Sequence, residues 1–297
     1  LAVLNELQRR NAAYPELACF TNEADPIRVA TRFGVTDFSR ILFCSGNEKT
    51  FEFLFSLLDE VLEVFPFEYV HLGGDEAVKE NWKRCPKCQN RMRELGLPDE
   101  RELQGWFLNR IKEHLQTRGR QAIIWNDGLC KTLDADFVCQ YWTPFFIEGK
   151  RRVVDWTNRG GRMIGSEFLH VYFDYPYSAI PLKKTFFYNP VPRGVRRGRR
   201  SGVIGTECAV WTEWIDTEGK LFFNILPRLA AAAENGWRTP KERNYRAFLT
   251  ALGSHLALYE RLGLPYAKHA ERELPLWQRL QIVKRFLKED THVELGE

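Results

Sequence analysis

The sequence predicts an α/β fold of the (β/α)-barrel type, and two observations lead to this class. Short apolar runs that are typical of buried strands alternate with segments of helical periodicity, which indicates a parallel sheet with crossover helices. Most predicted strands also end in acids or aromatic residues, which in a (β/α) barrel collect at the carboxyl ends of the strands. The 297 residues, 44% of them hydrophobic, suffice for one large domain or two small ones.

The predicted elements follow each other along the chain without repeats or low-complexity linkers. Strands are expected at 67–70, 121–125, 136–142, 162–174 (a strand or a strand pair) and 203–211. Helices are expected at 47–65, 102–118, 219–235, 240–262 and 274–288, and residues 1–15 have the pattern of a helix end. Residues 20–46 and the polar segment 77–99 are expected to be loops. The predicted domains are a partial barrel over 1–265 and a helical extension over 266–297.

One motif organises the chain, His71-Leu-Gly-Gly-Asp-Glu-Ala77, directly after the strand at 67–70. Two consecutive glycines permit a sharp turn and a close approach of a ligand. Asp75 and Glu76 can both reach one cavity from such a turn, and two neighbouring carboxylates cannot both ionise freely. The pair therefore predicts a general acid beside a permanent anion, which glycosidic bond cleavage needs. The alternative is a strand-to-helix turn in which one acid caps the next helix.

The other predicted strands end in residues that suit a sugar site, because an aromatic face stacks on the C–H groups of a sugar. These residues are Trp125, Trp142, Tyr172 with Asp174, and Trp211 with Glu213. His71 is predicted to be structural, beneath the glycine turn. Four other tryptophans are assigned to packing because they lie within helical or loop patterns: Trp106, Trp156, Trp237 and Trp277.

Three segments together resemble the family-20 glycoside hydrolases, the β-N-acetylhexosaminidases, over about residues 10–265. They are 71–76, the run Trp211-Thr-Glu213, and the segment from Pro227 to Trp237. The resemblance implies a (β/α)8 TIM barrel, of which this chain holds about five of eight βα units plus C-terminal helices. The family's Arg after the first strand, Asp after the second and Pro-Gly-His after the third are not in this sequence. The chain is therefore expected to begin just after the third of these motifs.

The resemblance also implies a reaction, the release of terminal β-linked GlcNAc or GalNAc with retention, through an oxazolinium intermediate. Glu76 would protonate the leaving oxygen and then activate water, while Asp75 would orient the substrate's 2-acetamido group. Trp125, Trp142 and Trp211 would line the acetamide and the sugar face. Tyr172 would donate a hydrogen bond to the acetamide oxygen with Asp174 beside it, and Glu213 would bind sugar hydroxyls.

Two alternatives stay open: a truncated, non-catalytic sugar-binding relative, and a disaccharide-releasing enzyme similar to a lacto-N-biosidase. After Trp125 the chain reads Asn126-Asp127, where the family more often has an acid directly, and this departure is expected to have little consequence.

The expected partner is an N-acetylhexosamine-terminated oligosaccharide or glycoconjugate, and no cofactor is expected. A net charge of +4 points to no particular partner. The basic run at 193–200 is interpreted as a solvated loop and not as a nucleic-acid site, because no aromatic residues are interleaved with it. No apolar run is long enough to span a membrane, and no signal peptide is visible. A homo-oligomer stays open, and so does the cellular compartment.

The cysteines predict neither a disulfide framework nor a metal site. Their number is odd and they are widely spread: Cys19, Cys44, Cys85, Cys88, Cys130, Cys139 and Cys208. Cys85 and Cys88 form a CxxC motif, but neither a second CxxC nor a histidine pair accompanies it. The motif is therefore interpreted as a surface turn, and whether its two thiols are free or disulfide-bonded stays open.

Overall fold

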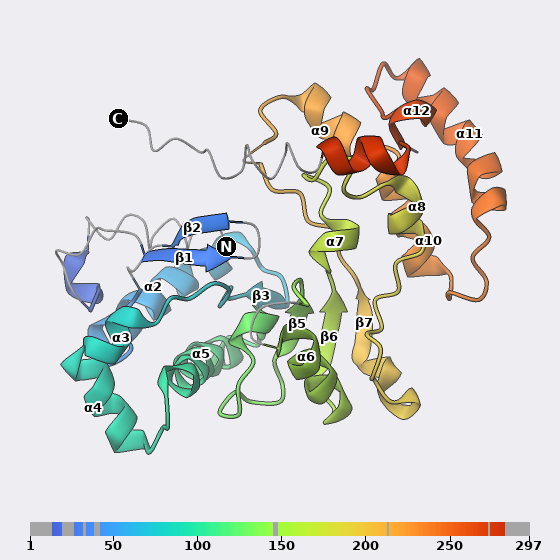
Figure 1. Ribbon diagram of the computed structural model, residues 1–297. Coiled ribbons are helices and arrows are strands. Elements are labelled where there is room, and N and C mark those ends of the chain that lie inside the picture. Colours follow the sequence, from blue (N-terminus) through green and yellow to red (C-terminus); the bar gives the residue numbers. More distant parts are fainter. Residues whose placement is uncertain are drawn as a thin grey trace, which may run out of the picture. The chain divides into compact units, whose positions relative to one another are not determined.

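The computed structural model describes residues 14–19, 27–31, 34–38, 42–144, 148–212, 214–272 and 274–282. Its central element is a parallel sheet of five strands whose order follows the chain (Figure 1). The strands are β3 (Tyr69–His71), β4 (Gln121–Trp125), β5 (Val138–Tyr141), β6 (Arg162–Gly165) and β7 (Val203–Thr206). The predicted α/β class with parallel strands is confirmed.

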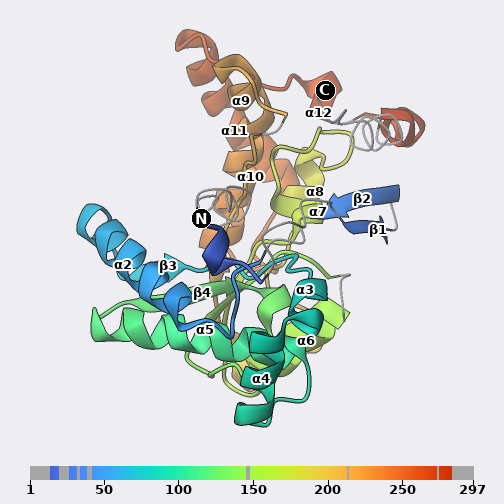
Figure 2. The same ribbon diagram turned by 90° about the vertical axis from the view of Figure 1, so that its left-hand side faces the viewer.

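The chain divides into two compact units, Leu1–Gln140 with Phe145–Met163, and Tyr141–Pro144 with Ile164–Glu297. In the first unit, α2 (Glu48–Val64) and α5 (Glu100–Thr117) lie side by side (Figures 1 and 2). Each begins where an acceptor side chain caps the first turn: Asn47 accepts from the amide of Lys49, and Asp99 from those of Arg101 and Glu102. Both helices agree with the predicted ones within a few residues.

Two segments of the first unit differ from the loops that were predicted. An antiparallel hairpin of β1 (Ile27–Thr31) and β2 (Gly34–Phe38) follows the short 3-10 helix η1 (Pro15–Leu17). The segment after β3 contains α3 (Glu80–Arg84) and α4 (Pro86–Leu95). Proline suits the first turn of α4, and Gly96 ends that helix at a φ of 64°. These short elements lack the long periodic pattern by which a helix is recognised in a sequence.

The CxxC motif lies at the junction of α3 and α4 and is buried, so its prediction as a surface turn is wrong. Cys85 and Cys88 expose 2% and 0% of their surface, and both are free thiols. The first unit also contains η2 (Asn126–Gly128) and α6 (Gly149–Asn158).

The second unit is mainly helical after β7. Its elements are α7 (Phe168–Val171), α8 (Leu182–Phe186), η4 (Arg197–Gly202), α9 (Glu218–Ile225), α10 (Arg228–Trp237), α11 (Tyr245–Arg261), α12 (His269–Arg272) and the helical residues 276–282. Helices α8, α10 and α11 share one apolar core, in which Phe186, Ala231 and Leu252 are fully buried. The grouping of these helices is visible in Figure 1.

Four predicted elements of the second unit differ in their bounds, among them the strand expected at 203–211, which ends at Thr206. The helix expected at 219–235 is interrupted at Pro227, since proline donates no amide hydrogen bond and separates α9 from α10. Helix α11 begins after Asn244, whose side chain accepts from the amide of Ala247, and not after Thr239. The strand expected over 162–174 ends at Gly165, and Tyr172 forms only an isolated parallel bridge with Ala209.

Of the four tryptophans assigned to packing, Trp156 is buried and Trp106 packs against a buried cluster of the first unit. Trp237 and Trp277 expose 89% and 60% of their surface, so their core assignment is wrong. Trp237 is the last residue of α10 and extends beyond the packed part of that helix.

None of the helices in the described part of the chain is both long and apolar enough to cross a membrane. Residues 1–13 of the helix end expected at 1–15 lie outside the described residues, and so do residues 283–288 of the last predicted helix. The predicted boundary at residue 265 stays a prediction.

Candidate active site

The glycine turn after β3 is fixed on the end of β4. The amide of Leu72 donates to the carbonyl of Ile123 at 2.7 Å, and the amide of Trp125 donates to the carbonyl of Gly73 at 2.9 Å. Gly73 and Gly74 have φ angles of 76° and 91°, a region that favours glycine. The two glycines are therefore needed to lead the chain from the strand to Asp75 and Glu76.

Glu76 has a φ of 48°, which is uncommon for a residue with a side chain. Its amide donates to Oδ2 of Asp127 at 3.1 Å, and Asp127 lies in η2 directly after β4. Backbone held in such a conformation is concentrated at functional sites, where the surrounding structure enforces it. That the Asn126-Asp127 departure has little consequence stays a prediction, while Asp127 itself binds the backbone of the predicted acid.

The glycine turn has two further supports. The side chain of Gln104, on α5, donates to the carbonyl of Gly74 at 2.8 Å. His71 Nδ1 accepts from the amide of Gly73 at 3.0 Å, and the imidazole lies 4.6 Å from the ring of Trp125. Burial lowers the pKa of His71 to about 4, so its ring is neutral and carries its proton on Nε2. The structural role predicted for His71 is confirmed.

The two carboxyl groups of the turn differ in their protonation. Desolvation raises the pKa of Asp75 to about 6, with a smaller contribution from the charge of Asp127. Desolvation raises the pKa of Glu76 to about 7, and the charges of Asp75 and Asp127 add to it. The Glu76 side chain still reaches solvent. Both carboxyl groups therefore titrate near neutral pH, and Glu76, with the higher pKa, keeps its proton to higher pH than Asp75, as acid catalysis beside an anion requires.

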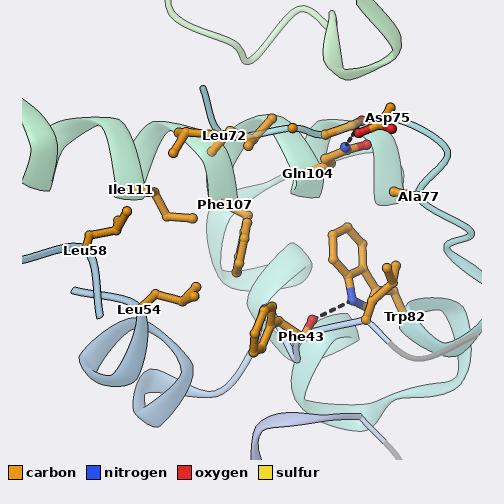
Figure 3. Close-up of a pocket in the computed structure, with 14 residues that line it drawn as sticks. Phe43, Leu54, Leu58, Leu72, Asp75, Ala77, Trp82, Gln104, Phe107 and Ile111 are labelled. Atoms are coloured by element: carbon orange, nitrogen blue, oxygen red, sulfur yellow. Dashed lines mark hydrogen bonds between the residues drawn. The ribbon is translucent and has the colours of Figure 1, made fainter. Parts of the chain in front are cut away.

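A small cavity lies beside the turn (Figure 3). Asp75 and the glycines border it at one end, and mainly apolar side chains line the rest, among them Leu54 of α2 and Phe107 and Ile111 of α5. Its volume is about 80 Å³, whereas pockets for small molecules have roughly 300–1,000 Å³. The cavity is therefore a packing gap behind the turn and not a sugar pocket.

The aromatic residues predicted to bind sugar are divided between the two units. Trp125 packs on His71 in the first unit. In the second, the ring of Tyr172 lies 6.4 Å from that of Trp142 and 6.1 Å from that of Trp211. Tyr172 is held by its bridge to Ala209, and the amide of Phe168 donates to the carbonyl of Trp142 at 2.9 Å. Trp211 exposes 38% of its surface, so part of its ring is available to a ligand.

Asp174 follows the aromatic cluster and is 6% exposed. Its charge acts on the buried guanidinium of Arg228, whose pKa burial lowers to about 10. Asp174 is therefore partly engaged in neutralising a buried cation. Glu213, the last predicted site residue, lies outside the described residues.

Sequence reasoning missed Asp127 as a part of this site. The sequence contains a signal for it, namely an acid two residues after the tryptophan that ends β4. The carboxyl ends of neighbouring parallel strands meet at one edge of the sheet, so this acid is expected close to the end of β3. That placement brings Asp127 next to the turn that follows β3.

Comparison with known proteins gives a consistent result. The family model described as "Glycosyl hydrolase family 20, catalytic domain" matches residues 7–240. A "Beta-hexosaminidase" of Porphyromonas gingivalis is 30% identical over 267 residues, which are 86% of this chain and 33% of that protein. A "Beta-hexosaminidase" of Akkermansia muciniphila is 26% identical, over 84% of this chain and 51% of its own length. The chain therefore spans between a third and about half of these two curated relatives.

Solved structures agree with the sequence comparison. A beta-N-acetylhexosaminidase from Bacteroides fragilis is 29% identical with a TM-score of 0.70, covering 87% of this chain and 51% of that one. A GH20 exo beta-N-acetylglucosaminidase from Vibrio harveyi, solved in complex with N-acetylglucosamine, is 25% identical with a TM-score of 0.74, covering 87% and 41%. The carboxylate turn, the parallel sheet and these matches lead to one conclusion: the chain belongs to the catalytic domain of glycosyl hydrolase family 20, the family of the β-hexosaminidases.

Proposed function

We propose that this chain carries the catalytic carboxylates of a retaining exo-β-N-acetylhexosaminidase that acts through an oxazolinium intermediate. The observation that carries the proposal is the strained turn at Asp75 and Glu76, where two adjacent carboxyl groups have pKa values raised to about 6 and about 7. A carboxyl group whose pKa lies near the working pH is suited to general acid–base catalysis. Substrate assistance replaces the second carboxylate nucleophile of most glycosidases.

The proposed roles follow from this difference in protonation. Glu76 donates its proton to the glycosidic oxygen as the acetamido oxygen of the substrate attacks the anomeric carbon, and it later accepts a proton from water. Asp75 stays ionised and stabilises the positive charge that develops on the acetamido nitrogen. Two successive inversions at the anomeric carbon leave its configuration retained. Asp127 acts as a positioning residue, because it binds the backbone amide of Glu76.

The substrate proposed is a terminal β-linked GlcNAc or GalNAc of an oligosaccharide or glycoconjugate. Trp125, Trp142 and Trp211 are proposed to contact the acetamide and the sugar face. Tyr172 is proposed to donate to the acetamide oxygen with Asp174 beside it, and Glu213 to bind sugar hydroxyls. The aromatic cluster of Trp142, Tyr172 and Trp211 supports the first part of this assignment, because it presents ring surfaces of the kind that stack on sugars.

The first test follows the products of the protein expressed from its full coding sequence. An aryl β-GlcNAc is expected to release the β-anomer of the free sugar first, as seen by proton NMR, while the matched aryl β-glucoside, which lacks the acetamido group, is expected to turn over at least about 100-fold more slowly. Initial release of the α-anomer, or equal turnover of the two glycosides, would contradict the mechanism. A tetrasaccharide substrate that loses a disaccharide and not one sugar would favour the biosidase alternative.

A second prediction concerns Asp127. Replacing it in Asp127→Asn keeps an oxygen that can accept from the Glu76 amide but removes a charge that raises the pKa of Glu76. The alkaline limb of the pH profile of kcat/KM, which reports the acid in the free enzyme, is therefore expected to shift to lower pH. Asp127→Ala also loses the oxygen that accepts from the Glu76 amide, so we expect the maximum value of kcat/KM in its pH profile to be lower as well. An alkaline limb that stays in place in the Asn variant would show that the charge of Asp127 does not reach Glu76.

A further inference from the structure

We propose that Cys19, Cys44, Cys85 and Cys88 bind one zinc ion in a structural site of the first unit. The four sulfur atoms all lie within 4.8 Å of one another. Three of their distances are 3.6 Å (Cys19 to Cys88), 3.7 Å (Cys44 to Cys85) and 3.7 Å (Cys44 to Cys88). The sequence did not predict this site, because two of its ligands come from single cysteines that lie 41 or more residues before the CxxC motif.

The distances fit a tetrahedral tetrathiolate. With zinc–sulfur bonds of about 2.3 Å, a regular tetrahedron has sulfur–sulfur edges of about 3.8 Å. A disulfide would bring two sulfurs to about 2.05 Å, whereas all four cysteines are free thiols. A set of four sulfurs without carboxylate or imidazole selects a soft, tetrahedral metal over calcium, magnesium or manganese. Four thiolates also complete the coordination of zinc, which makes the site structural and not catalytic.

The backbone around the cysteines supports the same assignment. Cys85 is the C-cap residue of α3 and the N-cap residue of α4, so the CxxC motif forms the turn between the two helices. A Cβ atom on Gly46 would lie 2.2 Å from the carbonyl carbon of Lys87 and 2.6 Å from the nitrogen of Cys88. Only glycine therefore allows the loop that carries Cys44 to rest directly on the backbone of the CxxC turn.

The site is shielded and connects separate segments. Cys44, Cys85 and Cys88 are buried with Leu42, Trp82, Met92 and Leu103 in one cluster. Trp82 Nε1 donates to the carbonyl of Phe43 at 2.9 Å and so joins α3 to the segment of Cys44 (Figure 3). Because α3 begins four residues after Glu76, a metal at this point would anchor the segment that follows the glycine turn. Zinc binding of this kind contributes directly to folding free energy.

The test begins with the metal content of the unmodified protein. Purified without chelators, it is expected to contain one zinc ion per chain by inductively coupled plasma mass spectrometry. Apoprotein prepared under reducing conditions is expected to bind Co²⁺ at one equivalent, with the intense sulfur-to-cobalt charge-transfer band and visible bands of a tetrahedral tetrathiolate. Absence of both zinc and saturable Co²⁺ binding would overturn the proposal, and stoichiometric iron would overturn the assignment to zinc.

Cysteine-to-serine variants test whether the four clustered cysteines bind the metal, in contrast to a cysteine outside the cluster. Cys88→Ser and Cys44→Ser are expected to lose stoichiometric zinc and the tetrathiolate cobalt spectrum, and chelator is expected to lower the Tm of the wild type but not that of the variants. The control is Cys130→Ser, which removes a half-buried thiol of the same unit outside the cluster and is expected to keep both metal and spectrum. Equal metal binding by Cys88→Ser and Cys130→Ser would contradict the site.

Discussion

Glu76→Gln is expected to lower kcat/KM for an oligosaccharide substrate by roughly 10²–10⁴-fold, the usual contribution of a general acid. The amide matches the carboxyl group in size but has no proton of suitable acidity to give to the leaving oxygen. The raised pKa of about 7 leaves a substantial fraction of the wild-type side chains protonated at neutral pH, and this proton is what the variant lacks.

The leaving group distinguishes acid catalysis from a general loss of structure. A glycoside of an acidic phenol needs little protonation, so its kcat/KM is expected to fall far less in Glu76→Gln than that of an alkyl or sugar glycoside. The matched control is Glu80→Gln, which changes an exposed carboxylate of α3 that pairs with Lys83 at 3.4 Å in the same helix; we expect its kinetics to equal the wild type. Equal losses of Glu76→Gln on both kinds of aglycone would contradict the assignment of Glu76 as the acid.

The same variant has a second signature, in thermal stability. A carboxyl group whose pKa rises on folding binds its proton more tightly in the native state, so the stabilisation that it gives is complete below the unfolded pKa of about 4.3 and is lost as the pH rises through about 7. Glutamine has no such dependence. The Tm of Glu76→Gln is therefore expected to exceed that of the wild type at pH 8 and to approach it near pH 4.

Arg228→Met is expected to destabilise the second unit by about 3–5 kcal/mol, the usual cost of breaking a buried charged network. Arg228 exposes none of its surface. Its guanidinium donates to the carbonyls of Phe173 at 2.7 Å, Tyr175 at 2.9 Å and Asn224 at 2.6 Å. It also lies 4.2 Å from the ring centre of Tyr177. Methionine fills much of the volume but leaves these buried carbonyl oxygens without donors, each of which costs about 1–3 kcal/mol.

Chemical denaturation of the full-length protein, followed by the fluorescence of its tryptophans, measures this loss. Arg228→Lys keeps the charge but cannot reach several carbonyls at once, so we expect an intermediate loss. Arg238→Met, at the exposed C-cap residue that follows α10, serves as the matched control and is expected to change the free energy of unfolding by less than about 0.5 kcal/mol. If Arg228→Met were as stable as Arg238→Met, the hydrogen bonds of the Arg228 guanidinium would not stabilise the second unit.

Much of the fold could be predicted because its signals are local. Helices α2 and α5 repeat apolar residues over four or more turns, and strand β4 was predicted with its observed bounds. The short elements α3 and α4 and the β1–β2 hairpin were missed, because a segment of five to ten residues carries too few periods to separate a helix from a loop.

The candidate site was predicted in part for the same reason. Asp75 and Glu76 are neighbours in sequence, so their shared turn was already evident from the two glycines before them. Asp127 lies 51 residues after Glu76, and the contact exists only because β3 and β4 are adjacent parallel strands whose ends meet.

By itself, the sequence determined the family and the α/β class, and it predicted the acid pair, because the motifs that carry them are short runs of neighbouring residues. Only the tertiary structure showed that Asp127 contacts this pair. It also showed that the sulfur atoms of four cysteines far apart in the sequence lie within 4.8 Å of one another. The physical reason is that electrostatic and coordinate interactions act over a few ångströms in space, whatever the separation along the chain.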